Sequence, residues 1–301
     1  MRINKIMILS FFAVYVIWGS TYLAIKYAIE TLPPFGMSSV RFFCGAAILF
    51  LISHYKKEGP LTRDEKKISA FSGILLIFAN AVVCLVEFWV PSGIVAVIIG
   101  AMPIWIMLVG WMFFRHARPT ILRVLGSLIG LAGVALITFG GAVPEVSGIG
   151  RFGTLFLIGS SFLWAIGTLI QKKSFGVKSV FRFSSFQMLA GAIPTGMISL
   201  VFEKPWEYFD KGISGVSILA FLYLVIFGSV IAFTAYSWLS RNVDSHLVST
   251  YALVNPIIAV LLGTIFFQEQ LSSKLLGASV LVIFGLTLII GFKKSVRVPA
   301  K

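Results

Sequence analysis

The sequence predicts an all-α membrane protein with ten transmembrane helices, arranged as two inverted repeats of five helices each. Three observations predict this fold. Of 301 residues, 58% are apolar and 12% are charged, whereas soluble domains are about half apolar and about a quarter charged. Apolar runs of about 20 residues, the length that crosses a bilayer, follow one another along the whole chain. A motif near the N-terminus also recurs in the second half.

The spans are predicted from apolar runs between charges and Pro or Gly breaks. They cover residues 6–29, 35–53, 68–90, 92–114, 121–140, 151–171, 181–202, 214–238, 245–267 and 275–292. The first run is longer than a signal-peptide core and lacks an Ala-x-Ala site, so we expect it to be retained. The longest connector, residues 54–67, is of loop size and leaves no room for a soluble domain.

The predicted spans distribute the basic residues of the loops and tails very unequally between the two sides of the membrane. One side would carry Arg2, Lys5, Lys56, Lys57, Arg63, Lys66, Lys67, Arg115, Arg118, Arg123, Lys172, Lys173, Lys178, Arg182, Arg241, Lys293, Lys294, Arg297 and Lys301. The other side would carry Arg151, Lys204, Lys211 and Lys274. Because cytoplasmic loops hold the excess of Lys and Arg, both termini are predicted to be cytoplasmic, in the inner (plasma) membrane. The net charge of +14 is dispersed in this way over short loops and predicts no nucleic-acid surface.

The two halves of the chain resemble each other. The segment Trp18-Gly-Ser-Thr-Tyr-Leu-Ala-Ile-Lys26 recurs loosely as Trp164-Ala-Ile-Gly-Thr-Leu-Ile-Gln-Lys172, at an offset of 146 residues. The segment Met102-Pro-Ile104 likewise recurs as Asn255-Pro-Ile257, at an offset of 153. We therefore expect two domains, residues 1–142 and 143–301. Since five spans is an odd number, the second copy would enter the membrane from the opposite side, which is the arrangement of many secondary transporters.

Several short motifs carry a resemblance to a known family. They are Ile17-Trp-Gly-Ser-Thr-Tyr22, Val40-Arg-Phe42, Val90-Pro-Ser-Gly93, Arg241-Asn-Val243 and Tyr251-x-x-Val-Asn-Pro256. With these motifs the chain resembles the EamA family of the drug/metabolite transporter superfamily, in its YedA-like branch. The resemblance implies two five-helix copies, cytoplasmic termini and export of small metabolites or drugs through a central cavity.

Intramembrane charges are costly in hydrocarbon and are functional candidates. Asn80, Cys84 and Glu87 form one stripe of the third span, with Glu87 toward its outer end. Arg41 and Lys26 lie toward the same end. Glu87 is therefore predicted to pair with Arg41 or Lys26 as an outer gate, or to bind a proton or cationic substrate. The alternative is that Glu87 and Lys26 only reach the headgroup layer.

Tryptophan prefers the membrane interface, so tryptophans at mid-membrane indicate a cavity lining or helix packing. Trp18 with Thr21 and Trp164 with Thr168 occupy matching places in the two copies, and Trp105 is a weaker third candidate. The resemblance to the family favours a substrate cavity lined by Trp18, Asn80, Trp105, Trp164, Tyr251 and Asn255.

Two prolines stand at corresponding places in the fourth and ninth spans. Tyr251 and Asn255 share a face directly before Pro256, and Pro103 is its counterpart. Each proline removes a backbone hydrogen bond, which either frees a carbonyl for substrate or gating or only bends the helix. Gly126, Gly130 and Gly133 form a small-residue stripe suited to close packing within or between protomers.

Other classes of function find less support in the sequence. Cys44 and Cys84 lie within apolar runs without metal-like spacing, and the three histidines fall near span ends, so neither a metal site nor an enzyme is predicted. A P-loop signature is absent from the sequence, so transport would run on gradients. The expected function is a secondary-active exporter of small amphipathic metabolites or drugs, without a cofactor, with a proton as the candidate coupling ion, as a monomer or homodimer. A passive facilitator or channel, or a membrane scaffold or lipid scramblase, remains the alternative.

Overall fold

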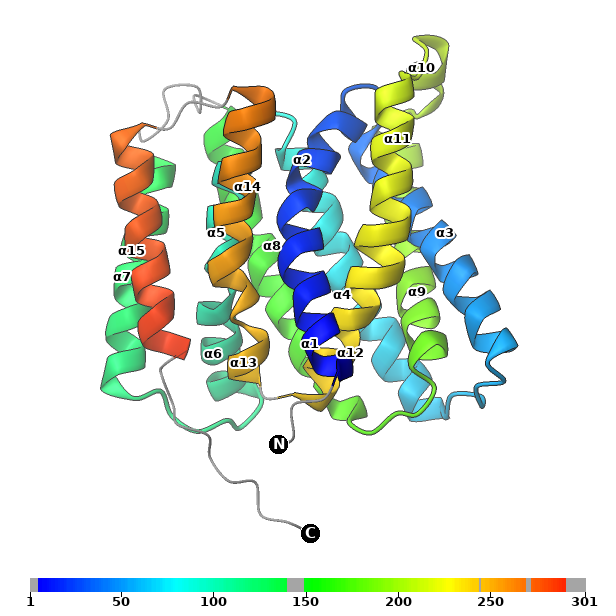
Figure 1. Ribbon diagram of the computed structural model, residues 1–301, viewed down its shortest axis with the longest axis horizontal. Coiled ribbons are helices and arrows are strands. Elements are labelled where there is room, and N and C mark those ends of the chain that lie inside the picture. Colours follow the sequence, from blue (N-terminus) through cyan, green and yellow to red (C-terminus); the bar gives the residue numbers. More distant parts are fainter. Residues whose placement is uncertain (1–4, 140–148, 244, 269–271, 291–301) are drawn as a thin grey trace.

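In a computed structural model, the protein is described at residues 5–139, 149–243, 245–268 and 272–290, and the regular structure of these residues is entirely helical. The helices run back and forth between two ends of the molecule (Figure 1). In the first half these are α1 (Lys5–Phe12), the π-helix η1 (Ala13–Ile17), α2 (Trp18–Ile29), α3 (Pro34–Tyr55), α4 (Arg63–Val86), α5 (Ser92–Gly100), α6 (Met102–Phe113) and α7 (Ile121–Phe139). In the second half they are α8 (Ile149–Gln171), the 3₁₀-helix η2 (Lys172–Ser174), α9 (Val180–Phe202), α10 (Trp206–Asp210), α11 (Gly215–Tyr223), the π-helix η3 (Leu224–Phe233), α12 (Thr234–Asn242), α13 (Ser245–Val248), α14 (Tyr251–Phe267) and α15 (Ser273–Ile290).

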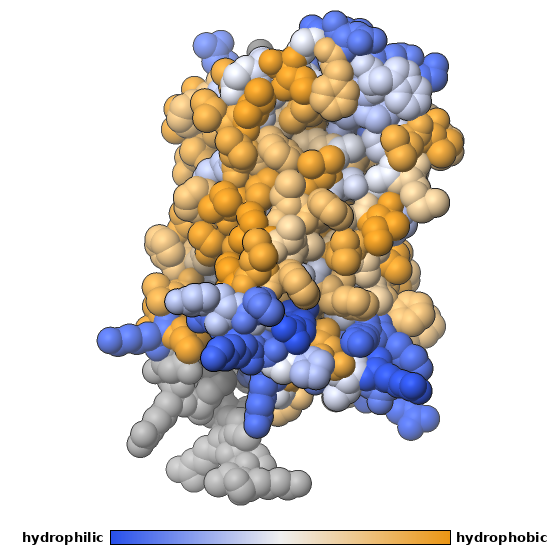
Figure 2. Space-filling view, turned by 90° about the vertical axis from the view of Figure 1, so that its right-hand side faces the viewer, coloured by the Kyte–Doolittle hydropathy of each residue, from blue (hydrophilic) through white to orange (hydrophobic). Residues whose placement is uncertain are grey.

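Among the described residues, seven helical stretches are long and apolar enough to cross a membrane. They are Lys5–Ile29, Pro34–Tyr55, Arg63–Val86, Ser92–Phe113, Phe152–Ser174, Val180–Phe202 and Gly215–Asn242, with three shorter apolar helices at Ile121–Leu136, Tyr251–Phe267 and Ser273–Ile289. Figure 2 shows the expected surface, a broad apolar band between hydrophilic ends. The predicted all-helical, multi-pass membrane fold is confirmed, while the count of ten spans and the inverted repeat stay predictions.

Local chemistry explains where the helices depart from the predicted spans. α4 begins at Arg63 rather than at residue 68, because Thr62 and Glu65 form a capping box: Glu65 N donates to Thr62 Oγ1 (3.2 Å) and Thr62 N donates to Glu65 Oε2 (2.7 Å). The predicted fourth span is interrupted at Ala101, and the predicted ninth span is interrupted between α13 and α14. Because α4 begins early, the connector between α3 and α4 is shorter than the predicted connector of residues 54–67.

The two prolines differ in what they do to their helices. Pro103 lies in the first turn of α6, where a backbone N–H would have no helical partner, so it costs the helix nothing. Pro256 lies inside α14, and Gly100 of α5 packs directly against it: a Cβ at position 100 would lie 3.0 Å from Pro256 Cγ and 3.1 Å from the carbonyl oxygen of Ala252. Pro256 has no N–H to donate to the carbonyl oxygen of Ala252. This carbonyl therefore lies without its helical donor at the close crossing of α5 and α14.

Paired helices form the two edges of the molecule. α3 packs against α9 at one edge and α7 against α15 at the other, with α2, α4, α5, α8 and α14 between them (Figure 1). At the α7–α15 crossing, a Cβ on Gly126 would lie 2.6 Å from Gly285 O, and a Cβ on Gly133 would lie 2.8 Å from Ala278 O. The small-residue stripe of α7 therefore packs within the protomer.

A reciprocal pair of carboxylates joins α3 to α9. Glu203, directly after α9, accepts hydrogen bonds from Phe35 N (2.8 Å) and Gly36 N (2.9 Å) in the first turn of α3. At the opposite end of the molecule Glu58, shortly after α3, accepts hydrogen bonds from Phe181 N (3.2 Å) and Arg182 N (2.8 Å) in the first turn of α9. Each helix thus ends near a carboxylate that satisfies the free N–H groups and positive dipole end of its neighbour.

We expect Glu203→Gln to lower the free energy of unfolding by about 1–2 kcal/mol, because a charged acceptor at a helix N-terminus becomes a neutral one. Thermal unfolding of the purified protein in detergent measures the effect. Glu207→Gln is the matched control, since Glu207 is half exposed and pairs with the exposed Lys204 (3.4 Å). Its expected cost is at most about 0.5 kcal/mol, and equal losses for the two variants would contradict the capping role of Glu203.

Candidate functional site

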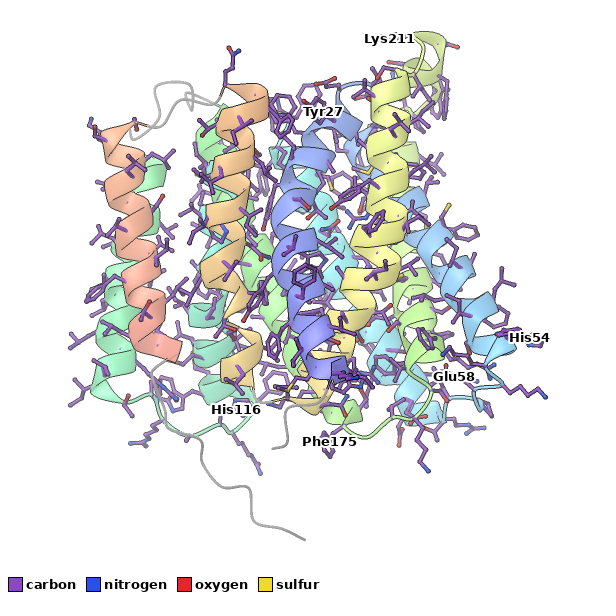
Figure 3. All side chains as sticks on the ribbon, viewed as in Figure 1. Tyr27, His54, Glu58, His116, Phe175 and Lys211 are labelled. Atoms are coloured by element: carbon purple, nitrogen blue, oxygen red, sulfur yellow. The ribbon has the colours of Figure 1, made fainter. Side chains whose placement is uncertain are left out.

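A small cavity lies among the central helices. In Figure 3 the end of the molecule that carries His54, Glu58, His116 and Phe175 is drawn lowermost. The cavity is lined by residues of α2, α3, α4, α5, α6, α8, η3 and α14: Trp18, Thr21, Tyr22, Ile25, Arg41, Phe42, Asn80, Val83, Ile99, Met102, Ser160, Ser161, Trp164, Phe233, Tyr251 and Asn255. Its volume is about 60 Å³, enough for a few water molecules. Sites for drug-sized ligands usually measure about 300–1,000 Å³, so this conformation is a constricted one.

Four aromatic rings close the lower end of the cavity. We call Trp18, Trp164, Tyr236 and Tyr251 the aromatic floor. The Trp18 ring centroid lies 5.5 Å from Trp164, 4.8 Å from Tyr236 and 5.7 Å from Tyr251. Most of these pairs meet edge to face or tilted, the arrangement that aromatic quadrupoles favour.

Hydrogen bonds fix the orientation of the floor. Trp164 Nε1 donates to the Tyr236 hydroxyl (3.0 Å), which also lies 2.6 Å from Thr168 Oγ1. Trp18 Nε1 donates to the carbonyl oxygen of Gly228 (3.3 Å), within the π-helix η3. The floor therefore links α2, α8, η3, α12 and α14, and a movement of any one of these elements would disturb it.

One charged side chain, Arg41, lies in the described cavity wall. It is 2% exposed and its Nε donates to Ser229 Oγ (2.8 Å), while Nη1 lies 3.4 Å from Asn80 Oδ1. A Cβ at Gly228 would lie 2.7 Å from Arg41 Nη2, so the glycine leaves room for the guanidinium. Arg41 thus joins α3 to α4 and η3 and gives the cavity a positive charge.

The other two charged candidates lie outside the cavity wall. Glu87 directly follows α4, is 2% exposed, and acts through space on Arg41 and Tyr22. Lys26 places its Nζ 5.0 Å from the ring centroid of Phe267, near the end of the molecule that carries Tyr27 (Figure 3). Arg41, by contrast, donates hydrogen bonds to the neutral side chains of Ser229 and Asn80.

The structure brings most of the predicted substrate-binding residues together. Trp18, Thr21, Asn80, Trp164, Tyr251 and Asn255 all line the cavity. Thr168 lies one turn below, beneath the floor, and Trp105 instead packs edge to face on Phe162 (5.8 Å). With its amide oriented to donate, Asn255 bonds the carbonyl oxygens of Tyr15 (3.0 Å) and Tyr251 (3.2 Å), which attaches η1 to α14.

Sequence reasoning missed several residues of this site. Tyr22 and Ile25 follow Trp18 at helical spacing and a search for one face of α2 would have found them. Tyr236, Ser229 and the wall serine Ser160 gave no such signal, because their partners are remote in sequence. Ser161, which bonds Leu157 one turn earlier in its own helix, gave no signal of a cavity either. The π-helices η1 and η3 beside the cavity were not predicted either, although π-segments are frequent at functional sites.

A second, larger hollow faces the lipid side of the molecule. It measures about 730 Å³ and lies between α3, α9, α10 and α11. Its wall is apolar except for Ser39 and Ser199, whose hydroxyls bond Ala192 O (2.8 Å) and Glu203 Oε2 (2.7 Å). Both hydroxyls of the groove wall are therefore already hydrogen-bonded within the protein. Neither is free to bind the headgroup of a lipid that crosses the membrane.

Among the described residues, no group of three or more His, Cys, Asp and Glu side chains is placed to hold a metal ion.

The comparisons with known proteins agree with this architecture. The sequence matches the EamA-like transporter family over residues 5–139 and again over residues 151–291. It is 34% identical over 281 residues to a protein of Escherichia coli (strain K12) described as the uncharacterized inner membrane transporter YedA, covering 92% of this chain and 88% of that one. It is 22% identical over 285 residues to the uncharacterized transporter YoaV of Bacillus subtilis (strain 168), covering 92% and 94% of the two chains.

One solved crystal structure has the same fold, with a TM-score of 0.67 and 20% sequence identity over 95% of this chain and 97% of that chain. The family match extends over both halves of the chain, and the relatives are named as transporters. The chain therefore belongs to the EamA-like transporter family of membrane proteins.

Proposed function

We propose that this chain is a secondary-active transporter of the inner (plasma) membrane that exports small amphipathic metabolites, such as amino acids and related compounds, or drugs. The observation that carries the proposal is the central cavity, whose wall combines Trp18, Trp164 and Tyr251 with the amide of Asn80 and the charge of Arg41. Aromatic faces bind apolar groups, and the polar groups orient a ligand among them. The cavity lies between helices drawn from both halves of the chain.

We propose further that residues 1–142 and 143–301 are inverted repeats that move relative to each other, so that the cavity opens first to one side and then to the other. The reciprocal capping of α3 and α9 by Glu203 and Glu58 supports this symmetry, as do the two separate family matches. The aromatic floor would be the inner gate. Pro103, directly after the break between α5 and α6, and Pro256, inside α14, would provide the bends at which these helices move.

In this proposal the basic end of the molecule faces the cytoplasm. The loops at that end join α3 to α4, α6 to α7 and η2 to α9, and residues 56–67, 115–123 and 172–182 in and around them carry 12 of the 25 Lys and Arg residues of the chain. His54, Glu58, His116 and Phe175 all lie at this end in Figure 3. The cavity would then lie on the outer side of its floor. A monomer contains the whole cavity, and a homodimer would add nothing to the wall described.

Counterflow in reconstituted vesicles tests the proposed mechanism. Vesicles loaded with an unlabelled amino acid or amphipathic drug should accumulate the labelled compound transiently, because a carrier exchanges one substrate molecule for another. Transport should also saturate. A passive channel shows neither effect, so linear, unstimulated flux of a compound that the protein transports would overturn the carrier mechanism.

We propose that Glu87 is the coupling carboxyl, because it is a buried acid close to Arg41 and the cavity. Glu87→Gln should remove the dependence of transport on pH, since the amide cannot release or bind a proton. The measurement is initial uptake rate between pH 5.5 and 8.5, about the range over which perturbed carboxyls and histidines titrate. Glu207→Gln, on the exposed side of α10, should keep the wild-type profile. An unchanged profile in Glu87→Gln would exclude the coupling role.

A further inference from the structure

A second buried polar cluster lies directly below the aromatic floor. Its members are Ser72 on α4, Gln171 on α8, Gln187 on α9 and Ser237 and Arg241 on α12, which we call the inner cluster. Ser237 is adjacent to Tyr236 of the floor, and Gln171 follows Thr168 by one turn of α8. The cluster therefore lies between the cavity and the basic end of the molecule.

Hydrogen bonds join four members of the inner cluster. Gln187 Nε2 donates to Ser72 Oγ (2.7 Å) and to Gln171 Oε1 (3.1 Å). Ser237 Oγ lies 3.3 Å from Gln187 Oε1 and 3.5 Å from Gln171 Oε1. The acceptor oxygens of both glutamines are thus already used within the cluster.

The inner cluster contains more N–H donors than acceptors. Arg241 is 1% exposed; its Nε donates to Ser237 O (2.9 Å), and its guanidinium carbon lies 4.5 Å from the ring centroid of Phe183. In the part of the chain that the structure describes, Arg241 Nη1, Arg241 Nη2 and Gln171 Nε2 are buried without an acceptor. An arginine carries donors only, and a buried charge without a counter-ion costs several kcal/mol.

Among the described residues, the two acids with an electrostatic effect on Arg241 are Glu58 and Glu65, and they do not supply these acceptors. Glu58 binds the first turn of α9, and Glu65 completes the capping box of α4. Their carboxylates are held at helix N-termini and remain at charge–charge range from the guanidinium.

From this surplus of N–H donors and positive charge, we propose that the inner cluster is a binding site for a small anion, either free chloride or a carboxylate group, held by Arg241 and Gln171. A carboxylate accepts two parallel hydrogen bonds from a guanidinium, and a halide accepts hydrogen bonds from several N–H groups. The site is separate from the cavity and lies across the aromatic floor from Arg41. It would bind an anion from the basic end of the molecule.

Thermal unfolding of the full-length protein in detergent tests the site without any transport measurement. Replacing sodium isethionate, a sulfonate without a carboxylate group, by sodium chloride or sodium acetate at constant ionic strength should raise the unfolding midpoint saturably, by roughly 5 °C. Arg241→Gln should abolish the rise and should unfold in isethionate no earlier than the wild type, because it removes an uncompensated buried charge. Arg182→Gln is the control, since Arg182 lies at the same end but donates its Nε to Ser53 Oγ (3.0 Å).

The two anions distinguish the sources of the ligand. A response to chloride alone assigns a halide site, and a response to acetate assigns a carboxylate site. If Arg241→Gln does not fold, Arg241→Lys keeps the charge and should respond with at least about tenfold weaker apparent affinity, because a lysine cannot offer the paired donors. No response in the wild type, or an unchanged response in Arg241→Gln or Arg241→Lys, would overturn the proposal.

Discussion

Gly73→Ala should prevent α4 from packing against α9, and we expect it to be the most destabilising single-methyl substitution in the central helices. A Cβ at position 73 would lie 2.0 Å from the carbonyl oxygen of Gln187 and 2.7 Å from its carbonyl carbon. These are backbone atoms, so a rotamer change cannot relieve the clash. On α9, a Cβ at Gly191 would lie 2.5 Å from Gly73 O, which makes the close approach mutual.

The expected loss is about 3 kcal/mol, the upper part of the usual range for overpacking, or roughly 5 °C in the unfolding midpoint of a chain of this length. Gly159→Ala is the matched control. Gly159 lies within the helix α8, and a Cβ there would meet nothing within 4 Å. The free energy of unfolding of Gly159→Ala should stay constant or rise by up to about 1 kcal/mol, because alanine has a higher helix propensity than glycine. Similar midpoints for the two variants would show that α4 and α9 are farther apart than the structure has them.

The fold class followed from composition and run length, since a chain this apolar buries its helices in lipid. The helix interruptions were harder to foresee. The start of α4 was in fact readable, because Thr62-x-x-Glu65 is a capping-box signature. The break at Ala101 was not, because it depends on how α5 crosses α14 at Gly100.

The candidate site was predictable only where burial of a polar or aromatic group is itself unusual. Trp18, Asn80 and Trp164 stood out because such side chains are costly or misplaced in hydrocarbon, and all three line the cavity. The pairing of Glu87 with Arg41 or Lys26 stays a prediction. Arg41 also bonds Ser229, which no local pattern connects to it. Tyr236 was missed because its role arises from contacts with helices far away in sequence.

The two tryptophans Trp164 and Trp105 offer a sharp test of the cavity. Both were candidates from the sequence, and both make edge-on aromatic contacts. Trp164 lines the cavity and contacts Trp18 and Tyr236 of the floor, whereas Trp105 contacts Phe162 away from it. The two residues therefore resemble each other in packing and differ in access to a substrate.

We expect Trp164→Ala to lower the initial transport rate per folded molecule at least about 30-fold, because a buried aromatic anchor is worth about 2 kcal/mol or more. Trp105→Ala should lower it by less than about threefold, since its loss is one of packing alone. The transport rate of Trp164→Phe should lie between the rates of those two variants, because phenylalanine keeps a ring beside Trp18 but loses the N–H donor to Tyr236. The measurement is counterflow in vesicles with protein content normalised by gel filtration. If Trp105→Ala and Trp164→Ala lose transport equally, the effect of each is structural, and the cavity at Trp164 is not the substrate's path.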